Sequence, residues 1–213
     1  PRVLGQFLLH AGVVHLTAAH RSEAEARWAQ LGHIAENSRD PSLTCLENPT
    51  ASGLLATLDG RLTDAAAIGR SAQRRGADMG LPAPGGLGLL DGSLQALLHL
   101  GFVGEAKEAL TVVASLADVN SGGRLGASRA LVMAHGDQHQ QALQICDAVL
   151  AWNRDHDQLE TMPIFTAGRL LEVAVRCGAR AAAETLGRVL APASAYLDGR
   201  SPTCPARHLG AAS

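Results

Sequence analysis

The sequence predicts an all-α protein, built as an α-solenoid of about five antiparallel helix pairs. A sequence unit recurs about every forty residues. It consists of two Ala- and Leu-rich stretches separated by a small or polar residue, which breaks the helical pattern. Apolar residues inside these stretches recur at spacings of three and four, as they do on one face of a helix. No stretch alternates with the period of a strand over a useful length, so essentially no sheet is expected.

The break residues give the period of the repeat. They are His20, Gly60, Gly101, Gly136 and Gly178, at spacings of 40, 41, 35 and 42, and the copy around His20 is degenerate. Self-similarity at this period is typical of stacked helix pairs. A repeat array has no single globular core to divide, so residues 1–213 are expected to form one helical-repeat domain. The chain begins with Pro1 and stops at Ser213, soon after a helix expected from Pro205, which suggests a segment of a longer chain.

Each predicted pair has one helix before its break and one after it. The first helices are expected to include residues 13–19, 54–58, 94–100, 130–134 and 170–177, and the second helices to open near Ala24, Ala65, Ala106, Ala142 and Ala182. Two helices of a hairpin cross most closely beside their turn, where only a small side chain fits. Residues 3–19 are interpreted as a buried repeat helix, because Gln6, His10 and His15 interrupt a signal-peptide or membrane-span pattern.

Helix breakers predict the boundaries between pairs. Asp40-Pro41 is expected to end the helix that holds Trp28 and Leu31. Residues 76–88, which contain several Pro and Gly residues, predict a flexible linker. Turns are expected at residues 120–123 and 155–158, and a long loop at 192–205.

Composition narrows the classes of function. The formal net charge is -2 and aromatic residues make up 3% of the chain, so a direct role with nucleic acid or an anionic membrane is not expected. The cysteines are Cys45, Cys146, Cys177 and Cys204, and no two form a CxxC pair. Buried free thiols in a reducing cytoplasm are the expected state.

Three arrangements raise chemical hypotheses. His135 and His139 lie four apart with Cys146 seven further on, as zinc ligands can, but Gly136 marks a turn between them. Gly86, Gly88 and Gly92 approach the dinucleotide-binding fingerprint without a preceding strand. Asp155-His156-Asp157 could supply a carboxylate and a base, although a solvated turn explains it. No catalytic, cofactor-binding or metal-binding residue is assigned from these patterns.

The two-helix unit with small residues at fixed places resembles the tetratricopeptide repeat, a right-handed superhelix. Three segments resemble sequences in the helical-repeat region of large bacterial signalling proteins. They are Glu23-Ala24-Glu25-Ala26, residues 58–65 and residues 206–210. In those proteins an ATPase module precedes the repeats, with a class III adenylate/guanylate cyclase domain at the N-terminus in some and a LuxR-type DNA-binding domain at the C-terminus in others. The resemblance implies a regulatory scaffold, and any cyclase, ATPase or DNA-binding activity would belong to parts absent from this chain.

These observations predict a non-catalytic, cytoplasmic interaction scaffold without a cofactor. Its expected partner is a protein, a peptide or another domain of the same polypeptide. One alternative is a small-molecule sensor with its groove around residues 76–92. A second alternative is an enzyme with a metal held by His135, His139 and Cys146.

Overall fold

The computed structural model describes residues 1–114 and 123–193, and these residues form helices and turns with no β-strand. The chain divides into two compact units. The described part of unit 1 is residues 1–114, and that of unit 2 is residues 123–193. The all-α prediction is confirmed for the described residues, whereas the continuous solenoid and the single-domain organisation stay predictions.

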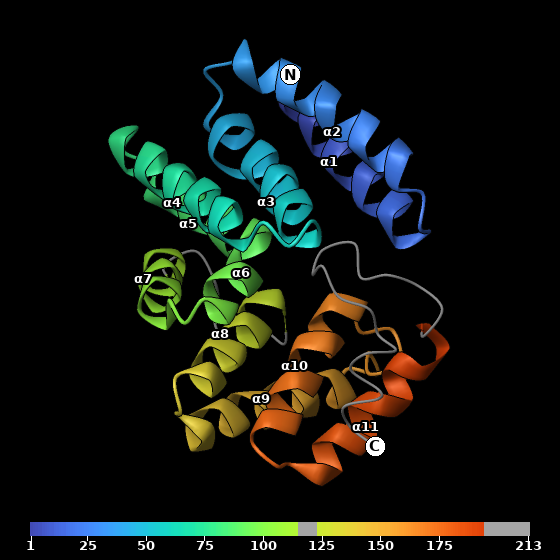
Figure 1. Ribbon diagram of the computed structural model, residues 1–213. Helices are drawn as coiled ribbons and strands as arrows, with labels where there is room; N and C mark the ends of the chain where they lie inside the picture. Colours follow the sequence, from blue (N-terminus) through green and yellow to red (C-terminus); the bar gives the residue numbers. More distant parts are fainter. Residues whose placement is uncertain (115–122, 194–213) are drawn as a thin grey trace. The chain divides into compact units, whose positions relative to one another are not determined.

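Unit 1 contains three successive helical hairpins (Figure 1). The first is α1 (Arg2–Thr17) with α2 (Arg21–Glu36). In the second, a π-helical segment η1 (Ser42–Glu47) continues into α3 (Asn48–Leu58), followed by α4 (Leu62–Asp78). The third is α5 (Pro82–Gly92) and α6 (Leu94–His99), followed by α7 (Val103–Val113). Each hairpin packs on the one before it, since α3 contacts α1 and α2, and α5 contacts η1, α3 and α4.

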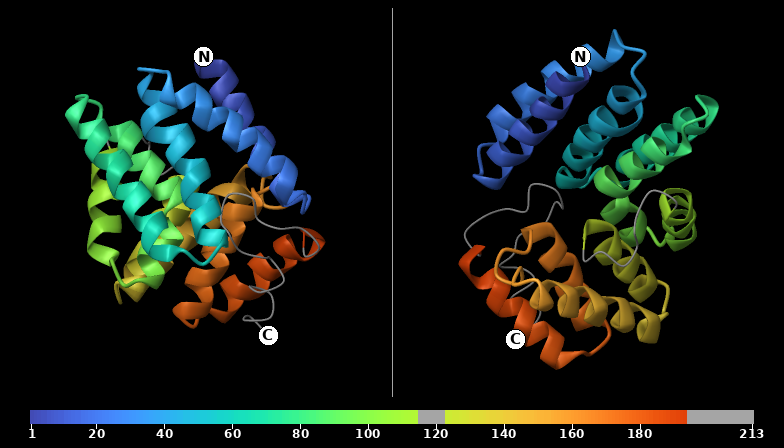
Figure 2. Two further views of the ribbon diagram at one scale, coloured as in Figure 1. Left: turned by 45° about the horizontal axis from the view of Figure 1, so that its top comes forward. Right: turned by 180° about the vertical axis from the view of Figure 1, so that it is seen from behind.

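Unit 2 contains two hairpins, which the two views of Figure 2 show from different sides. They are α8 (Arg124–His135) with α9 (His139–Asp155), and α10 (Ile164–Arg176) with α11 (Arg180–Leu190), which ends in the 3-10 turn η3 (Ala191–Ala193). The helix α10 packs on both α8 and α9. Most of the turn predicted at 120–123, most of the loop predicted at 192–205, the segment 206–210 and Cys204 lie outside the described residues.

All five hairpins are closed by the same turn. In the second hairpin Gly60 has φ +73°, and the next residue, Arg61, donates its N–H to the carbonyl of Ala56 at 2.8 Å. The carbonyl of Arg61 in turn accepts the N–H of Ala65 at 3.0 Å, which starts α4. The other left-handed residues in equivalent turns are Ala19, Gly101, Asp137 and Gly178. The bond from the Arg61 N–H to the Ala56 carbonyl is a Schellman closure, which satisfies a carbonyl at the end of the first helix.

In each of these five turns a buried alanine lies five residues after the left-handed residue. These alanines are Ala24, Ala65, Ala106, Ala142 and Ala183. The left-handed residues are spaced by 41, 41, 36 and 41. The predicted positions are wrong by one residue in three turns. The left-handed residues are Ala19 instead of His20 and Asp137 instead of Gly136, and the buried alanine of the last turn is Ala183 instead of Ala182. In the first and fourth turns an alanine and an aspartate hold the left-handed position, although His20 or Gly136 stands beside them.

The linker predicted over residues 76–88 is also wrong, because these residues belong to the end of α4, a short turn and most of α5. Pro82 begins α5, where a missing N–H costs nothing. The glycines serve close packing instead of flexibility. A Cβ on Gly85 would lie 2.6 Å from the carbonyl oxygen of Ala72, and one on Gly92 would lie 2.8 Å from the Cα of Thr50. Side chains at these positions would push α5 away from α4 and α3.

The core of the first two hairpins gathers around Trp28, whose indole N–H donates to the carbonyl of Leu9 at 3.2 Å. Leu31, Leu43 and Leu54 are fully buried beside it. The helix that holds Trp28 ends at Glu36, just before Asp40-Pro41, as predicted. An ion pair between Arg70 of α4 and Glu105 of α7, with N–O distances of 2.6 and 2.9 Å, ties the second hairpin to the third.

Candidate functional site

The residues of the metal hypothesis are not brought together. His135, at the end of α8, contacts the Glu172 carboxylate through Nε2 at 2.9 Å, while His139 lies 3.9 Å from Asp137. Cys146 is buried inside α9. Among residues 1–114 and 123–193, no group of three or more His, Cys, Asp or Glu side chains is arranged to hold a metal ion. The described residues therefore supply no ligand set for the metal-dependent interpretation.

The thiols that the structure describes are unpaired. Cys45 and Cys146 are buried, as expected, but Cys177 is partly exposed. Burial raises the pKa of Cys146 to about 12, and it also raises the pKa of Cys177. Both thiols are therefore protonated at neutral pH and poor nucleophiles.

The acidic cluster at residues 155–157 is a turn, as the sequence analysis expected. It closes α9, with Asp157 in the left-handed region at φ 55°. The His156 ring stacks on Trp152 at 4.3 Å between centroids, and its Nδ1 donates to the Trp152 carbonyl at 2.8 Å. These contacts hold the imidazole against its own helix.

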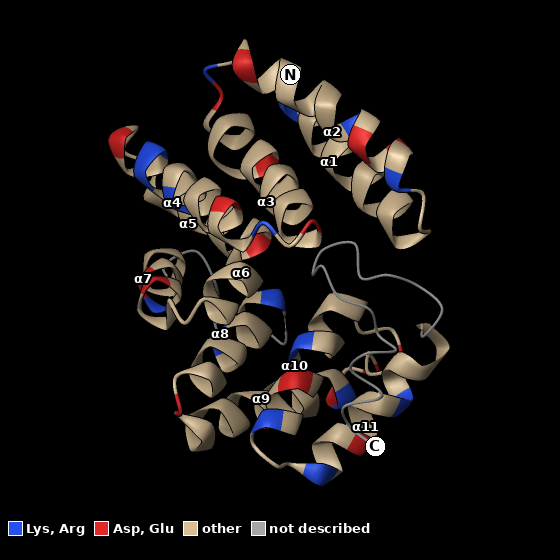
Figure 3. Ribbon diagram, viewed as in Figure 1, with Lys and Arg blue, Asp and Glu red and all other residues tan. Residues whose placement is uncertain are grey.

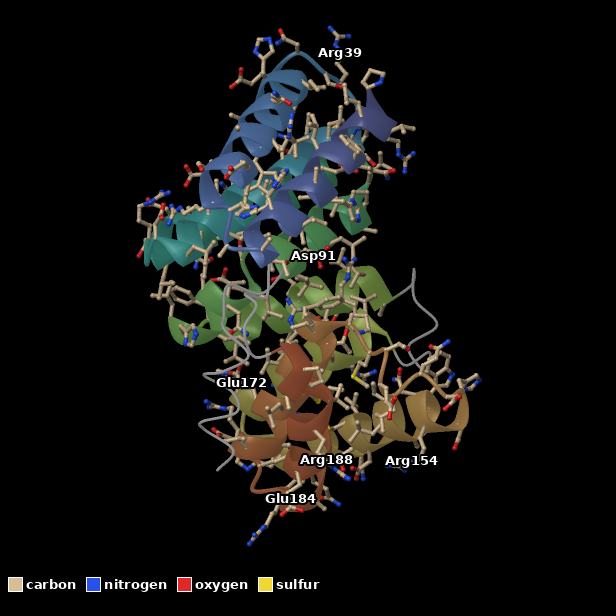
Figure 4. All side chains as sticks on the ribbon, turned by 90° about the vertical axis from the view of Figure 1, so that its right-hand side faces the viewer. Arg39, Asp91, Arg154, Glu172, Glu184 and Arg188 are labelled. Carbon is tan, nitrogen blue, oxygen red and sulfur yellow. The ribbon has the colours of Figure 1, made fainter. Side chains whose placement is uncertain are left out.

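A pocket of about 500 Å³ opens on the surface of unit 2. It is lined by Leu159, Glu160, Thr185, Arg188, Val189 and Pro192, and Figure 4 labels Arg188 on α11. Residues 76–92, where the alternative sensor hypothesis placed an effector groove, instead form tightly packed helices. Residues of this pocket come from a turn and a helix with no shared motif, so sequence spacing gave no signal for it.

An apolar face of α1 is exposed. Val3 is 79% exposed, Phe7 64% and Val14 66%, with Leu4 beside them at 50%. These are the four most exposed large hydrophobic residues in the described ranges. We call Val3, Phe7, His10 and Val14 the α1 seam, because their spacings of four, three and four place them along one line of the helix.

The corresponding face is covered in the later hairpins. Phe7 and Val14 lie twelve and five residues before the left-handed residue Ala19. In the third hairpin the equivalent positions hold Leu89 and Ala96, and both are buried. The remaining equivalents are buried or half-buried: Asn48, Leu55, Leu125, Val132, Thr166 and Val173. The fully buried repeat helix predicted over residues 3–19 is therefore wrong for one face, which none of the described elements covers.

The α1 seam is almost free of charge. Figure 3 shows charged residues concentrated on other helices of unit 1, while α1 carries Arg2 at its start and no carboxylate. His10 lies within the seam, and its Nδ1 donates to the Gln6 carbonyl at 2.7 Å. An exposed, mainly apolar strip with this little charge is typical of a protein-binding surface.

A buried carboxylate was missed by the sequence analysis. Glu47 is 1% exposed at the end of η1, and neither carboxylate oxygen has a hydrogen-bond partner among the described residues. Burial raises the pKa of this carboxyl, and the nearby Asp40 carboxylate adds to the shift. Extending the predicted helix back from Leu54 through Leu43 would have placed Glu47 on its buried face.

We expect Glu47→Gln to raise the free energy of unfolding at pH 7 by about 1–2 kcal/mol, since it removes a carboxyl group whose charged form is destabilised by burial. The folded state binds the proton more tightly than the unfolded state, because the folded pKa is raised. The unfavourable contribution of Glu47 to the stability of the parent therefore shrinks as pH falls toward the ordinary carboxyl pKa, and the advantage of the variant shrinks with it. Urea unfolding between pH 4.5 and 8 measures this, with exposed Glu108→Gln as control. An equal response of both variants would contradict the assignment.

Comparison of the chain with protein-family models, with curated proteins and with solved structures finds no match. None of the helices in the described ranges combines the length and the apolar character that a membrane crossing requires. Functional inference therefore depends on the surfaces described above.

Proposed function

We propose that this chain is a non-catalytic interaction scaffold, and that the α1 seam is its protein-binding surface. The observation that carries the proposal is the exposure of Phe7 and Val14 at positions whose equivalents are buried or half-buried in the other hairpins, with the exposed Val3 in line with them. Leaving such a strip in water is unfavourable by about 25 cal/mol per Å² of apolar surface, so a partner that covers it gains that free energy.

The scaffold is further proposed to act in the cytoplasm as part of a bacterial signalling or transcription-regulatory protein, in line with the resemblance to helical-repeat regions. Stacked hairpins suit this role, because each one repeats a rigid unit and leaves surface available on either side. The supporting feature is the common turn with its buried alanine, which fixes the geometry of every hairpin.

The test compares two baits in a pull-down with identification by mass spectrometry. The parent chain is one bait, and the other is Phe7→Glu, which places a carboxylate in the seam and removes no core contact because Phe7 is exposed. We expect at least one identified protein that the parent retains and the variant loses. Identical sets of proteins on both baits, with untagged copies of this chain from the lysate counted among them, would contradict the α1 seam as the binding surface.

A second candidate function is effector sensing, and the pocket beside α11 is the observation that favours it. Its apolar residues Leu159 and Val189 lie with Arg188 and Glu160, a combination that suits a small molecule with both apolar and charged groups. A ligand that raises the melting temperature of the isolated chain, and does so less for Arg188→Ala, would support this candidate over the scaffold.

A further inference from the structure

We propose that the partner of the α1 seam is a second copy of this chain, with the two α1 helices packed antiparallel about a two-fold axis. The inference rests on the proposed function, because it names the occupant of the same surface. Three properties of the seam lead to it: its symmetry, its lack of charge repulsion and its heptad-like spacing.

The spacing of the seam is the same in both directions. Val3, Phe7, His10 and Val14 follow one another by four, three and four residues. In an antiparallel pair, Val3 lies opposite Val14 of the second copy, and Phe7 lies opposite His10. A two-fold axis therefore maps every seam residue onto another seam residue, as an isologous interface requires. Alternation of three and four is also the spacing that keeps two helices in contact along their length.

Charge favours the antiparallel arrangement. The only Lys, Arg, Asp or Glu in α1 is Arg2, at its first position. In a parallel pair the two Arg2 side chains would approach one another, whereas antiparallel packing brings each of them to the C-terminal end of the other α1. That end carries the negative pole of the helix dipole. The first turn of α2 adds the Glu23 carboxylate close to this end of the hairpin, together with Arg21, whose charge is paired with Glu25 and Asp59.

The polar residue in the seam is compatible with this contact. His10 satisfies Nδ1 with the Gln6 carbonyl of its own helix, so only Nε2 needs a partner or water. Opposite Phe7 of the second copy, its ring can stack on an aromatic face. One aromatic pair on each side of the axis would then form the centre of the interface.

The size of the seam sets the expected affinity. From Val3 to Val14 the helix rises about 16 Å at 1.5 Å per residue. A contact made by one such helix buries less than the roughly 800 Å² per partner of a typical stable interface. We therefore expect a reversible dimer with a Kd on the order of 10–100 μM.

Sedimentation velocity over a concentration series of the whole chain tests the proposal. We expect a monomer–dimer equilibrium for the parent, and weakening by about tenfold or more for Phe7→Glu and Val14→Glu, since each dimer would bury two added carboxylates. The matched control is Ala29→Glu, which adds the same charge to an exposed position of α2 outside the seam. The control should dimerise like the parent.

Crosslinking tests the orientation. A mixture of Val3→Cys and Val14→Cys chains, treated with a short thiol crosslinker, should give a peptide linking residue 3 of one copy to residue 14 of the other. The parent treated alike controls for the native cysteines. A dominant link between two copies of residue 14 would overturn the antiparallel arrangement.

Failure of this inference is distinguishable from failure of the proposed function. A parent chain that stays monomeric up to several hundred micromolar overturns the second copy as occupant. If the pull-down then yields a different protein that Phe7→Glu loses, the scaffold function stands with another partner. Dimerisation that all three variants share equally also overturns the inference, because it would place the contact elsewhere.

Discussion

Gly88→Ala is expected to lower the free energy of unfolding by about 2–3 kcal/mol, although alanine is the better helix former. Gly88 lies in α5, and a Cβ there would stand far inside contact distance of the Cys45 carbonyl oxygen in η1. The clash is with backbone, which cannot rotate away, so α5 must move from η1. That movement would also loosen the neighbouring contact between Gly92 and Thr50.

Gly104→Ala is the matched control. Gly104 lies in helix α7, and a Cβ at this position meets nothing within 4 Å. Here only the backbone entropy and helix propensity change, so we expect a gain of about 0.5 kcal/mol. Chemical denaturation of both variants and the parent measures the difference. Equal effects of the two substitutions would show that α5 does not pack on η1 as described.

Ala106→Trp should lower the free energy of unfolding by about 3 kcal/mol or more. Ala106 is 0% exposed and lies in the first turn of α7, the second helix of its hairpin, where its N–H donates to the Phe102 carbonyl. An indole at this crossing needs space that the packed helices do not have, so the hairpin must open.

The control for this substitution is Glu108→Trp, two residues further along the same helix at an exposed position. It adds the same indole to α7 without overpacking, and its effect should stay within about 0.5 kcal/mol. Thermal and urea unfolding followed by circular dichroism give both values. If Ala106→Trp melts like the parent, the close crossing lies elsewhere in the hairpin.

The hairpins could be predicted because their signals are local. A small or polar break followed by alanine is enough to place a turn such as Gly60 with Ala65, since the left-handed backbone and the close crossing both lie within a few residues. The one-residue errors at Ala19 and Asp137 have the same origin. Local sequence alone does not say which of two neighbouring residues adopts positive φ.

What could not be predicted depends on elements far apart in the chain. The glycines of α5 resemble a linker in composition, and only the approach of α4 and η1 makes them packing positions. Val14 is as apolar as the buried Leu16, so sequence cannot show that one is covered and the other exposed. The lining of the pocket beside α11 likewise depends on how a turn and a helix meet.

The residue after each left-handed turn belongs to two helices at once. The amide N–H of Arg61 makes the last hydrogen bond to α3, and its carbonyl accepts the first hydrogen bond of α4. No residue lies between these two bonds. An insertion at this point would separate them and fray both helices, whereas extra residues between hairpins disturb neither. The interval from Gly101 to Asp137 is five residues shorter than the others, yet both turns keep the same bonds. The length of chain between hairpins can therefore change without altering the bonds that form the turns.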